Sequence, residues 1–183
     1  ALIGSPLTNR LLKSGARVLV LDDLSSCGSV KIDHLNGEPN FDIEEADVRD
    51  GEAMALLLRN TDTVFHLATR NVRLSLHRPT EVHEVNTIGT YNLLKAAAGR
   101  RVKRFIYCSS SEVHGDALEL PLREESPCNP KTIYGASKLA GEYYTGAFHR
   151  SGWLDAIIVR PHTTYGPRAH FHGHHGEVIP RFS

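Results

Sequence analysis

The chain has 183 residues and a mass of 20.2 kDa, and its 21 basic and 21 acidic residues leave no formal net charge. Apolar residues make up 40% and charged residues 23%, which is the composition of a folded globular domain and excludes a disordered chain. The balanced charge does not indicate a nucleic-acid partner. Because no apolar run reaches about 18 residues, we expect no membrane partner either. The three cysteines, Cys27, Cys108 and Cys128, are widely spaced, which favours a reducing, cytoplasmic location.

Short apolar runs alternate with longer amphipathic segments along the chain. The runs are rich in β-branched and aromatic residues, and we expect them to form strands at 17–21, 40–44, 63–67, 104–108 and 156–159. The segments between them predict helices at 5–13, 51–58, 79–98 and 132–150. Gly15 follows the first helix as a stop signal. This alternation predicts an α/β fold with a doubly wound parallel sheet.

The two longest expected helices each show one apolar face at three- and four-residue spacing. In the first of them the face consists of Val82, Val85, Gly89, Leu93 and Ala96. In the second it consists of Ala136, Leu139, Tyr143 and Ala147. Such a stripe is typical of the side of a helix that faces a core.

The first helix and the strand after it form a candidate dinucleotide site. Gly4 immediately precedes the helix, whose N-terminus could face a pyrophosphate with free N–H groups. Asp22 and Asp23 end the next strand, near the interval of about 20 residues at which an acidic side chain binds the adenosine ribose. A carboxylate at this position would repel a 2′-phosphate, so the pattern favours NAD over NADP.

Three further residues indicate proton-transfer chemistry. Tyr134 and Lys138 are four residues apart in YGASK, so on a helix they share one face. A nearby ammonium stabilises a phenolate, and we therefore expect Lys138 to lower the pKa of Tyr134. Upstream, the strand RFIYC is followed by Ser109, Ser110 and Ser111, at the strand end where α/β sheets bind ligands.

Together, these motifs resemble the extended short-chain dehydrogenase/reductase family of NAD-dependent nucleotide-sugar epimerases and dehydratases. The resemblance extends over almost the whole chain in eight segments: ALIGSPLTNRLLKSG, VLVLDDLSS, ADVRD, VFHLAT, VNTIGT, SSSEVHG, YGASK and RPHTTYGPR. Each match is weak alone, but eight in the right order are specific. The resemblance implies a Rossmann-type fold, NAD as cofactor and a nucleotide-diphosphate sugar as substrate.

The same resemblance assigns roles to individual positions. Ser110 would be the catalytic hydroxyl, Tyr134 the base, and Lys138 the residue that binds the nicotinamide ribose and tunes Tyr134. The cofactor-binding positions would be Ile3, Gly4, Asp22, Asp23, Ser26, Asp47, Val48, Ala68, Asn86, Tyr134, Lys138 and His162. The substrate would contact Ser110, Tyr134 and Thr163, and no metal is expected.

Departures from the family pattern bear on the subtype. In 4,6-dehydratases an Asp-Glu pair follows the catalytic hydroxyl, whereas this chain has Ser111 and Glu112, which argues against dehydration. Ser-Glu also resembles UDP-glucuronate decarboxylases and keeps Glu112 as a catalytic candidate. The sequence DDLSS and the triple serine favour a 4-epimerase. Decarboxylase and dTDP-glucose 4,6-dehydratase-like activities remain alternatives.

Other departures leave open a non-catalytic, NAD-binding regulatory module. Ala1 stands where the phosphate loop has its second Gly, His114 where a Tyr is usual, and Thr163 where many members have an Asn. The His-rich segment 168–176 is interpreted as a substrate loop rather than a metal site. Retention of all three catalytic residues argues against the regulatory alternative.

The resemblance also sets an expectation for the extent of the domain. Residues 1–183 would be a partial NAD-binding Rossmann domain that is truncated at its N-terminal strand and lacks the C-terminal substrate domain beyond the first loop, 163–183. Such a fragment would be inactive alone. A homodimer is expected, built through the helices at 79–98 and 132–150.

Overall fold

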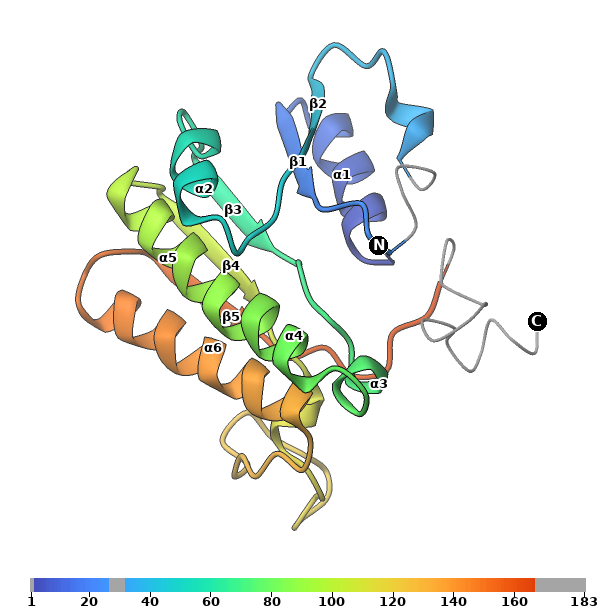
Figure 1. The fold of residues 1–183 in the computed structure, drawn as a ribbon, viewed down its shortest axis with the longest axis vertical. Helices are drawn as coiled ribbons and strands as arrows, with labels where there is room; N and C mark the ends of the chain where they lie inside the picture. Colours follow the sequence, from blue (N-terminus) through green and yellow to red (C-terminus); the bar gives the residue numbers. More distant parts are fainter. Residues whose placement is uncertain (1, 27–31, 167–183) are drawn as a thin grey trace. The chain divides into compact units, whose positions relative to one another are not determined.

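The computed structural model describes residues 2–26 and 32–166 (Figure 1). The strands are β1 (Val18–Asp22), β2 (Phe41–Glu45), β3 (Thr63–His66), β4 (Arg104–Cys108) and β5 (Ala156–Val159). The helices are α1 (Gly4–Lys13), α2 (Gly51–Leu57), α3 (Val72–Ser75), α4 (Pro79–His83), α5 (Thr90–Gly99) and α6 (Ile133–Arg150). Two 3₁₀ turns, η1 (Asp33–Leu35) and η3 (Ser111–Val113), and the π-helix η2 (Glu84–Gly89) complete the elements. The strands expected from the sequence and the helices expected at 5–13, 51–58 and 132–150 are confirmed, whereas the helix expected at 79–98 is divided and α3 is additional.

The described residues form two compact units, which we describe separately. The first contains the described residues of Ala1–Asp47 and Thr164–Ser183. In it β1 and β2 pair in parallel from Val18↔Phe41 to Asp22↔Glu45. Helix α1 precedes β1 and ends as the sequence predicts, since Gly15 has a φ of +84°, a left-handed conformation that favours glycine.

The second unit, Val48–Thr163, contains the parallel sheet β3-β4-β5. Helices α2, α5 and α6 lie over one face of this sheet, with α5 and α6 side by side (Figure 1). Side chains under these helices, such as Val64, Phe105 and Tyr107, are buried and form the core. Phe65 and Ile157, on strands of the same sheet, remain exposed.

The strand orders identify a Rossmann-type α/β fold. A doubly wound sheet has the order 3-2-1-4-5-6. In the first unit the parallel pair β1-β2 matches two neighbouring strands of this order, 2 and 3, and in the second unit β3-β4-β5 matches 4, 5 and 6. The predicted parallel, doubly wound class is therefore confirmed, although the described residues contain it as two sheets.

The long segment from Pro79 to Gly99 has the buried face that its sequence predicts. Val82, Val85 and Leu93 are at most 5% exposed. The segment is not one uniform α-helix, however, because the π-helix η2 separates α4 from α5. A π-turn holds more residues than an α-turn and is common at functional sites.

The predicted core face of α6 is wrong. Ala136, Tyr143 and Ala147 are exposed, and Leu139 is half-buried. The face of α6 that turns inward is instead small or polar and consists of Gly135, Ser137, Lys138, Gly141, Glu142 and Thr145, with Phe148. The inward face is small because the helix lies close to the sheet, and it is polar because it carries the groups that bond to the strand ends. The apolar residues of α6 therefore lie on its outer side.

None of the helices in the described residues combines the length and apolarity needed to cross a membrane.

Candidate active site

The Ser110 segment starts where β4 ends. Ser109 is buried, and Ser110 has extended backbone with φ −159° and ψ 154°. The Ser110 hydroxyl oxygen accepts a hydrogen bond of 3.2 Å from the backbone N–H of Glu112, and so caps η3. Glu112 itself is exposed. This cap uses a lone pair of the Ser110 oxygen and not its hydroxyl hydrogen, which can therefore be donated, as it is to Tyr134.

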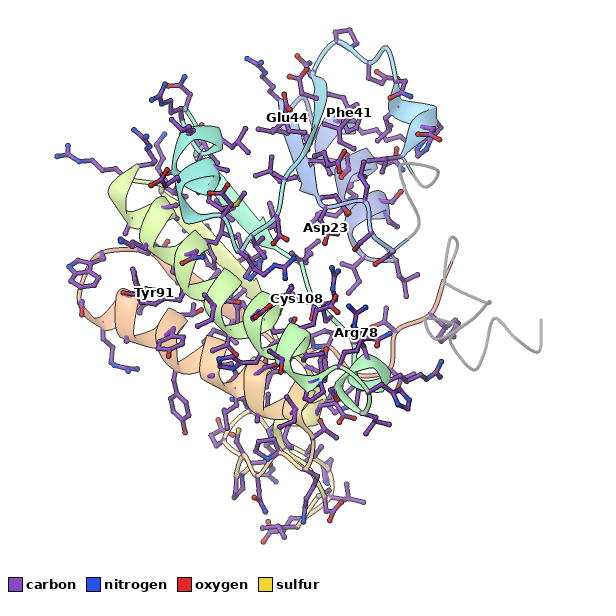
Figure 2. The ribbon with its side chains drawn as sticks, in the orientation of Figure 1. Asp23, Phe41, Glu44, Arg78, Tyr91 and Cys108 are labelled. Atoms are coloured by element: carbon purple, nitrogen blue, oxygen red, sulfur yellow. The ribbon has the colours of Figure 1, made fainter. Side chains whose placement is uncertain are left out.

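Helix α6 brings Tyr134 and Lys138 to this strand end. The helix begins after Thr132, whose hydroxyl accepts a hydrogen bond of 2.9 Å from the N–H of Gly135. Lys138 is 3% exposed, and its ammonium donates a hydrogen bond of 2.8 Å to the carbonyl of Cys108, the last residue of β4 (labelled in Figure 2). The same ammonium lies 5.9 Å from the centroid of the Tyr134 ring. The structure thus brings Ser110, Tyr134 and Lys138 together.

Burial shifts the pKa values of both ionisable groups on α6. It lowers the pKa of Lys138 from 10.5 to about 8. It raises the pKa of Tyr134, and hydrogen bonds with the hydroxyls of Ser110 and Thr69 only partly oppose this rise. The expected lowering of the pKa of Tyr134 is therefore wrong for the chain by itself: burial of the phenol raises this pKa, and the Lys138 ammonium donates its hydrogen bond to the carbonyl of Cys108.

A buried histidine, His66, is the last residue of β3, the strand paired with β4. His66 is 2% exposed, and burial, with a smaller effect from Lys138, lowers its pKa to about 3. Its Nε2 lies 2.8 Å from Oγ1 of Thr90, which itself donates to the carbonyl of Asn86 at 2.6 Å. Since Thr90 has only one hydroxyl hydrogen, Nε2 of His66 must carry the proton. His66 is thus neutral, and its orientation is fixed.

Asn86, from the π-helix η2, joins two parts of the site. Its side-chain oxygen accepts hydrogen bonds from the N–H of Arg70 at 2.7 Å and the hydroxyl of Thr69 at 3.2 Å. Its amide nitrogen donates to the carbonyl of Arg70 at 2.9 Å and to the hydroxyl of Ser137 at 3.1 Å. Asn86 therefore fixes the loop after β3 against α6. Ala68, another predicted cofactor residue, lies at the start of this loop.

The predicted cofactor residues of the first unit lie at α1 and after β1. Ile3 is the N-cap residue of α1, no side chain caps the helix, and its first turn has no acidic residue. The N-cap residue of α1 therefore provides no side-chain cap, which is compatible with a phosphate at this end of the helix. The Asp22 carboxylate accepts from the N–H of Leu24 at 2.8 Å, and Asp23 (Figure 2) accepts from the N–H and hydroxyl of Ser25. Ser26 is exposed in the same loop, and Asp47 ends this unit.

The remaining predicted residues are in the second unit. Val48 lies against Gly89, where an added Cβ would stand 2.5 Å from Cγ2 of Val48. His162 and Thr163 follow β5 and are exposed. Ala1 and the His-rich segment 168–176 fall outside the described residues. Within the described ranges, no three metal-ligating side chains gather.

Sequence reasoning missed a buried charge pair beside the site. Glu142 is 6% exposed and forms two hydrogen bonds with Arg160 and one with Ser109. The available signal was position: Glu142 stands four residues after Lys138 and hence on the same helix face. Its partners, Ser109 and Arg160, come from other elements, and no local pattern pairs them with Glu142.

A model of the NAD dependent epimerase/dehydratase family matches residues 1–183. The chain belongs to this family. NAD is the cofactor of the family, in agreement with the prediction from the sequence. The chain is 35% identical to UDP-glucose 4-epimerase of Mycolicibacterium smegmatis over 179 residues, which is 96% of this chain and 57% of that protein. It is 33% identical to human (Homo sapiens) dTDP-D-glucose 4,6-dehydratase over 169 residues, which is 90% of this chain and 47% of that protein.

Among solved structures, the fold is similar to that of DesIV, a dTDP-glucose 4,6-dehydratase from Streptomyces venezuelae with NAD bound. The TM-score is 0.91 at 31% identity, covering 98% of this chain and 57% of that chain. The chain thus spans about half the length of the relatives it matches. Epimerases and dehydratases both occur among these relatives, so membership of the family alone does not decide between the two activities.

Proposed function

We propose that the protein is an NAD-dependent nucleotide-sugar epimerase/dehydratase, most specifically a 4-epimerase, that acts through a 4-keto sugar. The observation that supports this most directly is the convergence of Ser110, Tyr134 and Lys138 at the end of β4. These groups come from two elements and meet at the strand end where α/β folds bind ligands. We propose residues 1–183 as part of the NAD-binding domain of the protein.

The proposed roles follow from hydrogen-bonding capacity. Tyr134 removes the proton from the C4 hydroxyl of the sugar, and Ser110, whose oxygen already accepts from Glu112 N–H, donates to the same sugar oxygen. Lys138 holds a positive charge beside Tyr134. Bound NAD would supply the hydride chemistry at C4 that these residues do not. In an epimerase the keto sugar rotates and presents the other face of C4 before the hydride returns, so no further acid or base is needed.

The residues of the first unit fit NAD. The uncapped start of α1 at Gly4 suits the pyrophosphate, and the Asp22 carboxylate suits the ribose hydroxyls while repelling a 2′-phosphate. In the second unit, Val48, Ala68, Asn86 and His162 are proposed cofactor contacts by family resemblance, and Thr163 is a proposed substrate contact. For Asn86 we propose that the contact is indirect, because its amide already bonds to Arg70 and Ser137.

The subtype rests on Ser111 and Glu112. A dehydratase needs an acid and a base in addition to Tyr134, and only Glu112 of this pair carries a carboxyl group. Its carboxylate is exposed, so it is accessible for decarboxylase or dehydratase chemistry, which remain alternatives. The widely spaced cysteines support the accompanying proposal of a cytoplasmic protein.

The experiment is product analysis by NMR on the protein expressed from its full reading frame. We expect interconversion of the C4 epimers of a UDP-sugar, and at least about a 100-fold loss of turnover in Tyr134→Phe, since general acid–base catalysis contributes on that order. A 4-keto-6-deoxy product or released carbon dioxide would establish the alternatives. NAD binding without turnover would indicate a regulatory module, and unchanged turnover in Tyr134→Phe would refute the proposed site.

We also propose a homodimer through α5 and α6. Tyr91 on α5 (labelled in Figure 2) has its ring centroid 5.6 Å from that of Tyr144 on α6. Together with Tyr143, which belongs to the apolar stripe of α6, these residues are 39–66% exposed. A second copy of this face would cover them. Sedimentation equilibrium should show a dimer that Tyr143→Glu weakens; a monomeric wild type would refute the interface.

A further inference from the structure

We infer that Glu142 is a positioning residue for catalysis: it fixes the ends of β4 and β5 against the helix that carries Tyr134 and Lys138. The inference rests on the proposed function, because it concerns how the Ser110, Tyr134 and Lys138 site is held in register. In the part of the chain that the structure describes, the Glu142 carboxylate forms hydrogen bonds with Ser109 and Arg160 and with none of these three side chains, so its effect passes through Ser109 and Arg160.

One stripe of α6 carries the three residues. Tyr134, Lys138 and Glu142 follow one another at intervals of four, so they lie on successive turns of the same face. Tyr134 is near Ser110, and Lys138 bonds to the carbonyl of Cys108. Glu142 continues the stripe, because its Oε1 accepts a hydrogen bond of 2.6 Å from the hydroxyl of Ser109, the residue between Cys108 and Ser110. Each turn of this stripe is thus tied to the strand end.

The carboxylate of Glu142 also holds the end of β5. Arg160, the first residue after β5, donates from Nε to Oε1 at 2.8 Å and from Nη2 to Oε2 at 2.7 Å, in a bidentate pair. Its third nitrogen, Nη1, donates to the carbonyl of Glu124 at 2.9 Å and lies 3.4 Å from Nε2 of His114. Arg160 thereby connects α6 to the long segment between η3 and α6.

Backbone bonds carry this tie to the catalytic serine. The N–H of Ser109 donates to the carbonyl of Val159 at 2.8 Å, and the N–H of Ser111 donates to that of Pro161 at 3.2 Å. Ser110 lies between these two anchored residues, so its position depends on both. Fixing Ser109 and Arg160 from α6 therefore sets the distance from Ser110 to Tyr134.

Stability alone does not account for such an arrangement. Glu142 is 6% exposed, and the Arg160 side chain is 25% exposed. Desolvation largely offsets the attraction within a buried ion pair, and apolar residues of similar volume often serve as well or better. An apolar pair could not orient the groups bonded to it, whereas Glu142 and Arg160 can. Here the bonded groups are the ends of β4 and β5 beside the site.

The test compares Ser109→Ala and Glu142→Gln with Thr145→Val in the protein expressed from its full reading frame. Ser109→Ala removes one hydrogen bond and leaves the Glu142–Arg160 pair intact. Thr145 is a matched control, because it lies on the same helix, is fully buried and has a hydroxyl without a partner in the part of the chain that the structure describes.

We expect about a 10-fold lower kcat for Ser109→Ala and at least as large a loss for Glu142→Gln, with KM and NAD affinity within about twofold, since small misplacements of catalytic groups cost rate. The rise of kcat with pH should move to higher pH, because a displaced Ser110 no longer lowers the pKa of Tyr134. Thr145→Val should retain the wild-type kcat.

Two results would overturn the inference, and they differ from each other. If Tyr134→Phe abolishes turnover while Ser109→Ala keeps both the kcat and the pH profile of the wild type, the positioning role is wrong and the proposed function stands. If Tyr134→Phe is as active as the wild type, the proposed function fails, and the inference fails with it. Should Glu142→Gln not fold, Ser109→Ala alone decides.

Discussion

At the scale of single residues, two ionisable side chains of the site are buried away from water. Lys138 and His66 are both at most 3% exposed, and burial lowers the pKa of each, to about 8 and about 3. His66 avoids the cost of a buried charge by remaining neutral and bonding to Thr90. Lys138 remains charged at pH 7, and its hydrogen bond to Cys108 compensates this charge only in part. The fold therefore contains a charge that lowers its stability.

Replacing this ammonium by an apolar group should stabilise the fold. In the wild type the pKa of Lys138 falls from 10.5 to about 8 on folding, so the full cost is present below pH 8 and disappears as the pH rises from about 8 to 10.5. Lys138→Met should raise the free energy of unfolding at pH 7 by on the order of 1 kcal/mol and should not gain further stability above pH 8. Urea titrations at pH 7 and pH 10 measure both effects.

Lys95→Met is the control for this prediction, because Lys95 lies on α5 with its side chain exposed. It should retain the pH dependence of the wild type. Equal pH dependence in Lys95→Met and Lys138→Met would contradict a buried ammonium at Lys138. Lys138→Met should at the same time lose turnover, so that stability and activity change in opposite directions.

At the scale of elements, the sequence predicts most of what is local. Strands such as β4 and β5 are encoded by short apolar runs, and the end of α1 is encoded by Gly15; these features occur where expected. The pair Tyr134 and Lys138 is equally predictable, because helical spacing alone puts both on one face. The inward face of α6 cannot be predicted in this way, because it consists of small and polar residues, whereas periodicity detects only apolar ones.

Contacts between elements account for the rest. The bonds of Asn86 to Arg70 and of Glu142 to Arg160 join residues 16 and 18 positions apart through side chains that no local pattern pairs. The π-helix η2 is also invisible in the sequence, because the apolar spacing from Val82 to Leu93 is that of an ordinary helix. Such features depend on which side chain of another element lies opposite.

Two glycines of α6 test how closely this helix approaches the sheet. A Cβ at Gly141 would lie 2.2 Å from the hydroxyl oxygen of the fully buried Tyr107, whereas at Gly146 it would meet only the end of the Arg150 side chain, at 3.0 Å. Gly141→Ala should cost about 1–3 kcal/mol of unfolding free energy. Gly146→Ala should gain up to about 1 kcal/mol from helix propensity. Denaturant titrations measure both; similar changes of one sign would contradict the close approach.

At the scale of the molecule, burial is uneven between the two units. Among the described residues of the first unit, only Ser5, Thr8 and Leu35 are buried. The second unit contains the fully buried Phe105, Tyr107 and other large core side chains. Because opening of a region costs more when it exposes more apolar surface, the two units should differ in local stability.

Hydrogen exchange can show this difference. We expect the amides of β4, including Phe105, which donates to the carbonyl of Asp155 at 2.9 Å, to exchange most slowly. The amides of β1, such as Val18, should exchange faster, by local opening rather than by unfolding of the whole chain. Mass spectrometry of peptides from 16–22 and 104–108 provides the measurement. Equal protection of the two strands would mean that the units open together.

The π-helix η2 has a consequence for insertions and deletions. An α-helix turns by about 100° per residue, so one residue more or less in this segment would rotate everything downstream by that angle. Val82 before the segment and Leu94 after it are both completely buried, and Asn86 between them bonds to the loop after β3. The number of residues in this segment is therefore fixed by the packing on both sides of it. Substitutions can be accommodated there, but an insertion or deletion would rotate Leu94 out of the core or Asn86 away from the loop after β3.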